Sequence, residues 1–231
     1  MRLTIANKNY SSWSLRPWVL MREVSAEFEE RLVPFFGAEW EAYVAESPNA
    51  MVPLLECNVG DGANSSVLSI WDSLAIAEFL AESYPVWPAE VAARAWARSA
   101  TAEMHSGFFE IRRVCTMNCG IRVRLFEWGA KLLSELQRLD ALWREGLHRF
   151  GGPFLAGARF SAADAFYAPV AFRVQTYQPE LSHEANQYVE RLLQRPSMQS
   201  WYRDALAEPW RDKSHEDEVL AVGEIVEDLR A

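Results

Sequence analysis

Apolar and polar residues alternate in two different ways along the chain, and the change comes near residue 85. Before it, short stretches with a period of two, typical of strands with one buried face, are separated by stretches with helical spacing. They predict strands at 2–6, 28–34, 52–57 and 67–71 and helices at 14–24, 40–46 and 72–84. The order β-α-β-α-β-β-α joins a crossover unit to a terminal hairpin, whose turn is predicted at Asp61-Gly62 with Asn64-Ser65-Ser66.

After residue 85 the helical spacing dominates. Pro85 and Pro88 bound a short linker. From Ala89 to Trp210 there is no convincing strand pattern, and long stretches rich in Ala, Leu, Arg and Glu predict helices, such as 89–119 and 123–150. We therefore expect an α/β domain at 1–85, an all-helical domain at 89–210 and an acidic tail at 211–231.

Composition narrows the function classes. The net charge of −9 argues against general affinity for nucleic acid or acidic membranes, and the tail from Arg211 to Ala231 holds seven acidic and three basic residues. In this tail Val219, Leu220, Val222, Ile225 and Val226 predict a short amphipathic helix. The start of the sequence lacks the apolar run of a signal peptide, and three cysteines suit a reducing compartment. We therefore expect a cytoplasmic protein.

The stretch from Tyr10 to Trp18 is the first candidate for chemistry. Ser11, Ser12 and Ser14 stand where the first predicted strand gives way to the first predicted helix. Helix starts leave backbone N–H groups unpaired and carry partial positive charge, so they hold anions well. The same serines are also typical N-cap and turn residues, and from this stretch alone the structural role is the commoner one.

Two later motifs have a structural and a functional interpretation. Pro53 opens the third predicted strand, where a trans bond is the common case and a cis bond would turn the backbone of Val52 towards an extended ligand. Asp72 and Ser73 stand at a helix start, where Asp72 is at least an N-cap. In the functional interpretation Ser73 and free N–H groups hold a ligand carboxylate, while Asp72 meets an ammonium group.

Together these motifs resemble the cytosolic glutathione S-transferase family. The fragments Ser11-Ser12-Trp13-Ser14, Met51-Val52-Pro53-Leu54 and Asp72-Ser73-Leu74-Ala75-Ile76 stand in that family's order, ahead of a helical half. Phe160-Ser161-Ala162-Ala163-Asp164-Ala165 is similar to the family's capping box, in which Ser161 and Asp164 each cap a backbone N–H. The resemblance covers the chain to about Trp210 and is closest to serine-type bacterial and zeta-like members.

The resemblance implies a thioredoxin-like first domain, glutathione as cosubstrate, no metal, and a homodimer. It implies that a cis-proline loop at Val52-Pro53 binds the cysteine backbone of glutathione and that Asp72-Ser73 binds its γ-glutamyl end. We expect Trp13 to be a further glutathione-binding residue, which reshapes the site wall. Two positions depart from the family pattern. Met51 stands where many members carry Lys or Arg, and Trp13 stands where zeta-like members carry Cys, which puts the isomerase substrate of that class in doubt.

A serine hydroxyl is the expected activator of the glutathione thiol. Ser11 is the first choice, because it opens a Ser-x-x-Ser spacing that matches Cys-x-x-Cys in redox relatives of the fold, and Ser12 is the second. With no cysteine in this spacing, dithiol–disulfide exchange is excluded. No histidine base is required, and we expect none of the four histidines near this stretch.

The acceptor substrate is expected against the second domain, where Met104, His105, Phe108 and Arg112 fall on adjacent turns of its first predicted helix. Core packing is the commoner role for Phe108, and Arg112 is a candidate for stabilising negative charge on the acceptor. Cys115 and Cys119 are four residues apart, on one predicted helical face, and are interpreted as buried thiols because no further metal ligands are near in sequence.

Three functions use such a site. The leading interpretation is a transferase in which glutathione thiolate attacks an electrophilic or hydrophobic small molecule. A non-catalytic module that binds glutathione or hydrophobic ligands is the alternative from another class. Glutathione-dependent isomerisation or peroxide reduction would run on the same site. The presence of both the serine stretch and the Asp72-Ser73 pair favours an enzyme.

Overall fold

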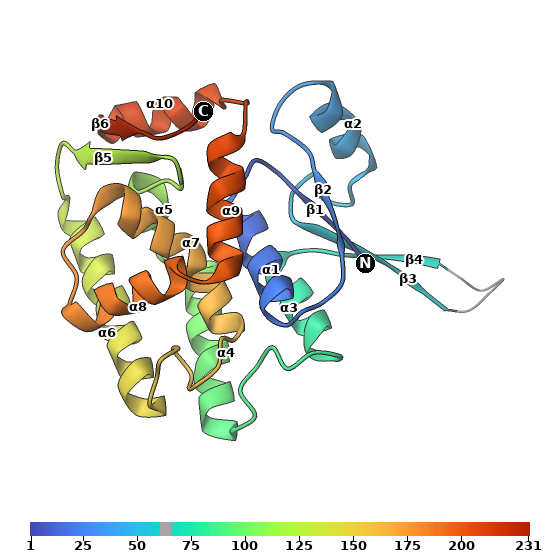
Figure 1. Cartoon of the computed structure of the whole chain (residues 1–231), viewed down its shortest axis with the longest axis horizontal. Helices are drawn as coiled ribbons and strands as arrows, with labels where there is room; N and C mark the ends of the chain where they lie inside the picture. The colour runs from blue at the N-terminus through green and yellow to red at the C-terminus, as the bar shows by residue number, and fades with distance from the viewer. Residues whose placement is uncertain (61–65) are drawn as a thin grey trace.

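The structure is a computed structural model of the chain, and it describes residues 1–60 and 66–231. Its N-terminal part is a four-stranded mixed sheet in the order β2-β1-β3-β4 (Figure 1). The strands are β1 (Arg2–Ile5), β2 (Glu29–Leu32), β3 (Leu54–Val59) and β4 (Ser66–Ile70). Strand β1 pairs in parallel with β2 and antiparallel with β3, and β3 and β4 form the predicted hairpin. The predicted turn residues Asp61 to Ser65 lie outside the described residues.

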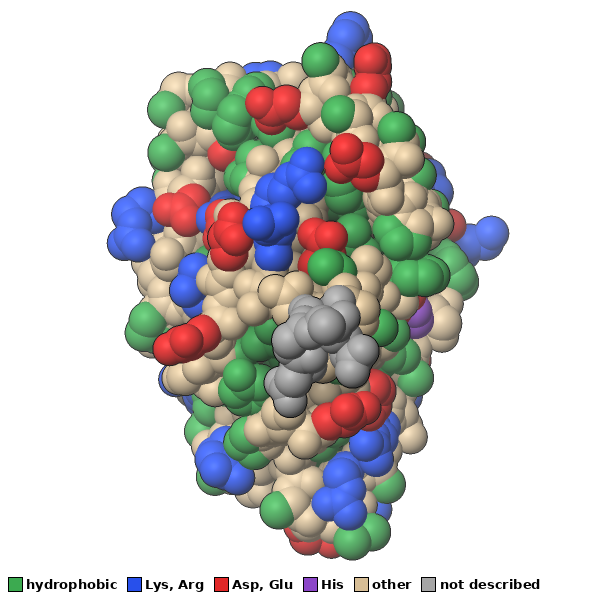
Figure 2. All heavy atoms as spheres, turned by 90° about the vertical axis from the view of Figure 1, so that its right-hand side faces the viewer, with side chains coloured by type: hydrophobic (Ala, Val, Ile, Leu, Met, Phe, Trp, Pro, Cys, Tyr) green, Lys and Arg blue, Asp and Glu red, His purple; other side chains and the backbone are tan. Residues whose placement is uncertain are grey.

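Three helices accompany the sheet: α1 (Ser12–Glu23), α2 (Ala38–Glu46) and α3 (Ser73–Ala81). The predicted order of strands and helices is therefore confirmed, with shifts of one to a few residues at the ends. Figure 2 shows the face on which the hairpin projects, where acidic and basic side chains are interspersed with apolar ones. The described part of that face has no broad field of one charge sign.

The remaining helices form the predicted helical part. They are α4 (Val91–Ser106), α5 (Phe109–Val114), α6 (Ala130–Phe150), α7 (Ala162–Tyr177), α8 (His183–Leu193), α9 (Pro196–Ala207) and α10 (Lys213–Val222). Helix α7 is buried along nearly its whole length and is the centre of this part. It begins at the predicted capping box, which is confirmed, since Ser161 and Asp164 each hold the other's backbone N–H. None of the helices in the described part of the chain is long and apolar enough to cross a membrane.

The expectation of a strand-free second half was wrong. Strand β5 (Ile121–Leu125) pairs antiparallel with β6 (Gly223–Asp228), so the helix predicted from residue 123 begins only at Ala130. In β5, Ile121, Val123 and Leu125 are buried while the arginines between them are not, which is the alternation of a strand. The amphipathic helix predicted in the tail is also only partly present, because α10 ends at Val222 and the apolar residues beyond it belong to β6.

The first helix of this half is also interrupted. Helix α4 ends at Ser106, and Phe108 adopts a left-handed conformation with φ of 53° before α5 begins. The predicted common helical face of Cys115 and Cys119 was therefore wrong, because both residues follow the end of α5. Both thiols are nevertheless buried, and burial raises the pKa of Cys115 to about 12. Neither thiol is therefore disposed to react as a thiolate.

Helix α1 lies between the sheet and the helical part and contacts both (Figure 1). Its Trp18 packs edge-on against Trp201 of α9, with ring centroids 5.1 Å apart. At its end Glu23 forms an ion pair with Arg195 at 2.5 Å. The middle and the end of α1, whose start carries the serines, are thereby held against the helical part.

Candidate active site

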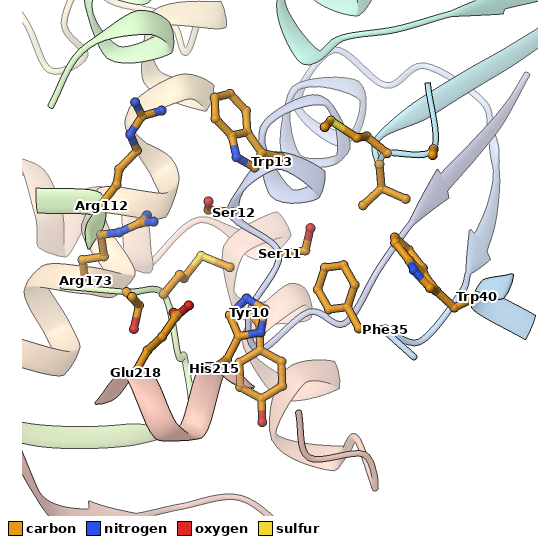
Figure 3. A pocket seen from close by; sticks show the side chains of 15 residues that line it. Tyr10, Ser11, Ser12, Trp13, Phe35, Trp40, Arg112, Arg173, His215 and Glu218 are labelled. Carbon is orange, nitrogen blue, oxygen red and sulfur yellow. The ribbon is translucent and has the colours of Figure 1, made fainter. Parts of the chain in front are cut away.

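A cavity of about 330 Å³ opens at the start of α1, between the sheet and the C-terminal helices (Figure 3). This volume is within the usual range for small-molecule sites. The first half of the chain contributes the start of α1, helix α2 and the loops before α1, α2 and β3, and the second half contributes α5, the loop after it, α7 and α10. The lining residues are Tyr10, Ser11, Ser12, Trp13, Phe35, Trp40, Ala50, Met51, Val52, Arg112, Thr116, Met117, Arg173, His215 and Glu218.

Local hydrogen bonds explain how the serine loop is held. The carbonyl of Asn7 accepts from the backbone N–H groups of Tyr10 and Ser11, at 3.2 and 2.8 Å, which closes a turn after β1. The side chain of Asn7 accepts from the N–H of Phe35 at 2.7 Å, which joins this turn to the loop before α2. Ser14 Oγ accepts from the N–H of Ala6 at 3.1 Å. The serines thus follow a turn that these hydrogen bonds hold in place.

The two candidate serines differ in what their hydroxyls do. Ser11 is the N-cap of α1: its Oγ accepts from the N–H of Ser14 at 3.4 Å and donates to Ser14 Oγ at 2.7 Å. Ser12 Oγ has no hydrogen-bond partner among residues 1–60 and 66–231, although its residue lines the cavity. The N–H of Trp13 is likewise without a partner in that part of the chain, as expected in the first turn of a helix.

The Val52–Pro53 bond is cis, so this prediction is confirmed. Val52 and Met51 line the cavity, and the hydroxyl of Tyr43 donates to the carbonyl of Met51. Pairing of β3 with β1 starts at Leu54, so the backbone of Val52 precedes the ladder.

Asp72 and Ser73 lie beside the cavity and not in its wall. Asp72 is the N-cap of α3, where Oδ1 accepts from two backbone N–H groups at 2.9 and 3.4 Å. Its Oδ2 lies 3.1 Å from His105 Nε2, and His105 packs edge-on against Trp13 with centroids 5.5 Å apart. Ser73 is fully buried, with no partner for its hydroxyl among the described residues. The pair therefore adjoins the cavity through His105 and Trp13.

Of the four residues expected on the acceptor side, Arg112 lines the cavity. Met104 and Phe108 are buried in the core, and Phe108 packs against Tyr167. His105 contacts Trp13 and Asp72, as described above. Arg173 of α7, which the sequence did not single out, lies in the same wall as Arg112.

The expectation that no histidine lies near the serine stretch was wrong. His215 of α10 lines the cavity and stacks on Tyr10 and Phe35, with ring centroids 5.0 and 5.5 Å away. Its Nδ1 lies 2.6 Å from Asp212 Oδ2, and the Asp212 side chain is 2% exposed. The acidic tail thus supplies a wall of the site.

A buried polar cluster fastens this tail to the serine loop. The hydroxyl of Tyr10 donates to Glu216 Oε1 at 2.7 Å, and Asn118 donates to the same oxygen at 3.1 Å. Arg230 donates to both carboxylate oxygens of Glu216 and to Asp228, and its side chain is 4% exposed. Burial raises the pKa of Glu216, but hydrogen bonds from Arg230 and Tyr10 outweigh it, so the net pKa is lowered. The carboxylate is therefore ionised and paired at neutral pH.

Within residues 1–60 and 66–231, no group of three His, Cys, Asp or Glu side chains is arranged to hold a metal ion.

Comparisons with known families match both halves of the chain. The model described as the glutathione S-transferase N-terminal domain matches residues 10–83, and the model of the C-terminal domain of the same family matches residues 123–204. Together they cover about two thirds of the chain, including the serine stretch, the cis-proline loop, the Asp72-Ser73 pair and the capping box. No curated protein sequence matches the chain.

Solved structures with this fold include three glutathione transferases. A homologue from Burkholderia BGR1 with bound glutathione is 22% identical, with 88% of this chain and 96% of that chain covered and a TM-score of 0.61. An enzyme from Methylococcus capsulatus Bath is 22% identical, with 88% and 98% covered and a TM-score of 0.62. Transferase Omega 2S from Trametes versicolor, in complex with 2,4-dihydroxybenzophenone, is 20% identical, with 96% and 99% covered and a TM-score of 0.62. These likenesses establish the fold.

Proposed function

Because the chain belongs to the glutathione S-transferase family, we propose that it binds glutathione in the cavity at the start of α1 and directs its thiolate at an electrophilic small molecule. The observation that carries this proposal is the hydroxyl of Ser12 in the cavity wall, next to the N–H of Trp13; neither group has a hydrogen-bond partner among residues 1–60 and 66–231. Both groups are available to donate a hydrogen bond to a ligand, and both stand at the positive end of a helix dipole.

These donors act on the acidity of the thiol. A thiol with a pKa near 8.5 is only about 3% thiolate at pH 7, and the thiolate is the nucleophile. A hydrogen bond to a charged acceptor contributes about 1.5–3 kcal/mol, and a helix dipole about 0.3–1 kcal/mol. Since one pKa unit corresponds to 1.36 kcal/mol, the two effects lower the thiol pKa by about one to three units. Thiolate then becomes a major species at neutral pH.

Ser12 is the better donor in this conformation. The hydroxyl hydrogen of Ser11 is directed to Ser14 Oγ, so Ser11 would have to give up that bond in order to donate to sulfur. Ser12 has no such bond to lose within the described residues. We therefore assign the thiol contact to Ser12, with Ser11 as the alternative that holds the turn and caps α1.

In this proposal the rest of glutathione occupies the cavity and its margin. The backbone of Val52, which lines the cavity ahead of the β3 ladder, would pair with the cysteine residue of the peptide. Asp72 and Ser73, at the positive start of α3, would receive the γ-glutamyl end, with Trp13 between them and the thiol. We further propose that the active form is a homodimer, as the family resemblance implies.

The test is the thiolate absorbance of bound glutathione, titrated in the ultraviolet for the wild-type protein, Ser12→Ala and Ser11→Ala. In Ser12→Ala we expect a thiolate pKa about one to two units higher and turnover about ten- to a hundredfold lower at pH 7. The deficit should shrink towards pH 9, where the free thiol ionises unaided.

Ser11→Ala is the matched control, because it removes an adjacent hydroxyl that already has a partner. We expect a smaller shift of the thiolate pKa and a loss of about 1 kcal/mol of stability from the missing N-cap. A larger shift of the thiolate pKa in Ser11→Ala than in Ser12→Ala would assign the thiol contact to Ser11. An unchanged pKa in both variants would refute activation by serine.

A further inference from the structure

We propose that the acceptor substrate carries a carboxylate, and that Arg112 and Arg173 bind this group while the thiolate attacks beside Ser12. This inference rests on the proposed function, since it names the substrate class of the same cavity. Figure 3 shows both arginines on one side of Ser12, with Phe35 and Trp40 on the other side.

Of the two arginines, Arg173 provides the stronger evidence for an anion site. Its side chain lines the cavity from α7, although the residue is only 5% exposed. Its Nε donates to the carbonyl of Cys115 at 2.7 Å, but its Nη1 is buried with no partner in the part of the chain that the structure describes. A buried cation with an unsatisfied donor costs free energy unless a ligand pairs with it. Burial accordingly lowers the pKa of Arg173 to about 10.

Arg112 faces the same space from α5. Its one hydrogen bond within the described residues is a long one of 3.4 Å to the carbonyl of His105, and it forms no ion pair there. Its neighbour Arg113 is different, since it is exposed and paired with Glu110 at 2.7 Å. Arg112 is half-buried, and its guanidinium lies 5.5 Å from the ring centroid of Trp13, which also lines the cavity.

A third guanidinium lies behind this wall. Arg16 is fully buried between Trp13 and Phe166, with its carbon 4.0 and 5.0 Å from their ring centroids. None of its three nitrogens has a hydrogen-bond partner among the described residues. Burial lowers the pKa of Arg16 well below its usual value, and repulsion from Arg173 and Arg112 lowers it further. The three cations therefore act on one another.

The cavity offers little negative charge against these cations. Glu218 is the acidic residue in the wall, and it forms no ion pair with Arg112 or Arg173 within residues 1–60 and 66–231. Asp72 acts on Arg16 through space, but its carboxylate already holds the start of α3 and His105. A bound anion would supply the missing partner. Two guanidinium groups suit a planar carboxylate, which they can hold through parallel N–H···O bonds.

The chemistry of substitution by glutathione thiolate is consistent with arginines beside Ser12. In a substitution the thiolate forms a C–S bond and the leaving group departs with the electron pair of its own bond, while the thiol proton has already gone to solvent. Cations that bind the carboxylate hold the acceptor in line with the sulfur, and an acceptor without a carboxylate does not gain this positioning.

Two matched acceptors test the proposal: 4-chloro-3,5-dinitrobenzoate and its uncharged carboxamide. In Arg112→Gln we expect kcat/KM for the benzoate to fall about ten- to a hundredfold, mainly through KM, with the carboxamide changed less than about twofold. Arg113→Gln should change neither. Arg173→Lys, which keeps the charge but loses the fork, should also affect the benzoate more than the carboxamide.

Direct binding separates this proposal from the proposed function. Calorimetric binding of unreactive 3,5-dinitrobenzoate should weaken in Arg112→Gln and persist in Arg113→Gln, whether or not either acceptor is turned over. If neither acceptor reacts in the wild type but this binding depends on Arg112, the transferase proposal fails and the anion site stands. If both acceptors react and Arg112→Gln affects them equally, the anion site is refuted. Equal weakening of glutathione binding would also refute it, because the arginines would then serve glutathione.

Discussion

Replacing Asp164 by alanine should destabilise the protein more than any surface substitution. The carboxylate is fully buried at the start of α7. Its Oδ1 accepts from the N–H of Leu155 at 3.0 Å and the hydroxyl of Tyr188 at 2.9 Å. Its Oδ2 accepts from the N–H and the hydroxyl of Ser161, both at 2.9 Å. One side chain thus joins α7, α8 and the loop before them.

The magnitude follows from the donors left behind. Two backbone N–H groups and the Tyr188 hydroxyl would be buried without an acceptor, at about 1–3 kcal/mol each. Burial raises the pKa of Asp164, so part of this loss is offset by removing an ion that is costly to bury. Removing one partner of a buried charged network typically lowers the free energy of unfolding by about 3–5 kcal/mol, and we expect a loss in that range here.

The assay is urea and thermal unfolding followed by far-ultraviolet circular dichroism. For a chain of this size about 1 kcal/mol lowers Tm by roughly 2–4 °C, so Asp164→Ala should melt about 6–20 °C lower. Asp217→Ala is the control, because Asp217 is exposed and, in the part of the chain that the structure describes, forms an ion pair only with Lys213 one turn away. That substitution should cost less than about 0.5 kcal/mol. An Asp164→Ala variant within about 1 kcal/mol of the wild type would refute the reasoning.

Two further predictions concern pH and assembly. Burial raises the pKa of Glu208 from 4.5 to about 6, against the hydrogen bonds from the N–H groups of Lys8 and Asn9. Since the folded state binds this proton more tightly, its contribution to stability is present below pH 4.5 and is lost as pH rises through 6. The difference in unfolding free energy between the wild type and Glu208→Gln should therefore shift by about 2 kcal/mol between pH 4 and 7, and a constant difference would contradict this assignment. For the homodimer, sedimentation at micromolar concentration should give twice the 26.4 kDa chain mass, and a species at the single-chain mass throughout would exclude it.

Local patterns were sufficient for the first half of the fold and not for the second. The strand and helix patterns up to residue 84 match the observed elements to within a few residues at their ends. The alternation of Ile121, Val123 and Leu125 was equally readable, but a five-residue strand inside a helix-rich stretch has no partner nearby in sequence. Its partner β6 lies about a hundred residues away, so only the tertiary structure reveals the pair.

The same limit applies to the site. Ser11, Ser12, Trp13 and Val52 were accessible to sequence reasoning because each belongs to a short motif with its own backbone geometry. His215 was not, because it reaches the cavity through contacts such as Tyr10 to Glu216, which join residues 206 positions apart. Arg173 lies in a helix that is buried on every side, so no apolar stripe in the sequence marks the face that turns to the cavity.

Helix α1 determines whether the two halves of this chain can be treated as exchangeable modules. It belongs to the first half by sequence, yet its Trp18 packs against Trp201 and the guanidinium of its Arg16 lies over the ring of Phe166, both in the second half. If the chain were cut at the Pro85 linker, the face of α1 that packs against the helical part would be exposed to water in the first fragment. The matching apolar surface of the helices would be exposed in the second fragment. Cooperative unfolding in one transition is the consequence. Hybrids built from two relatives would have to carry α1 and α7 from the same parent.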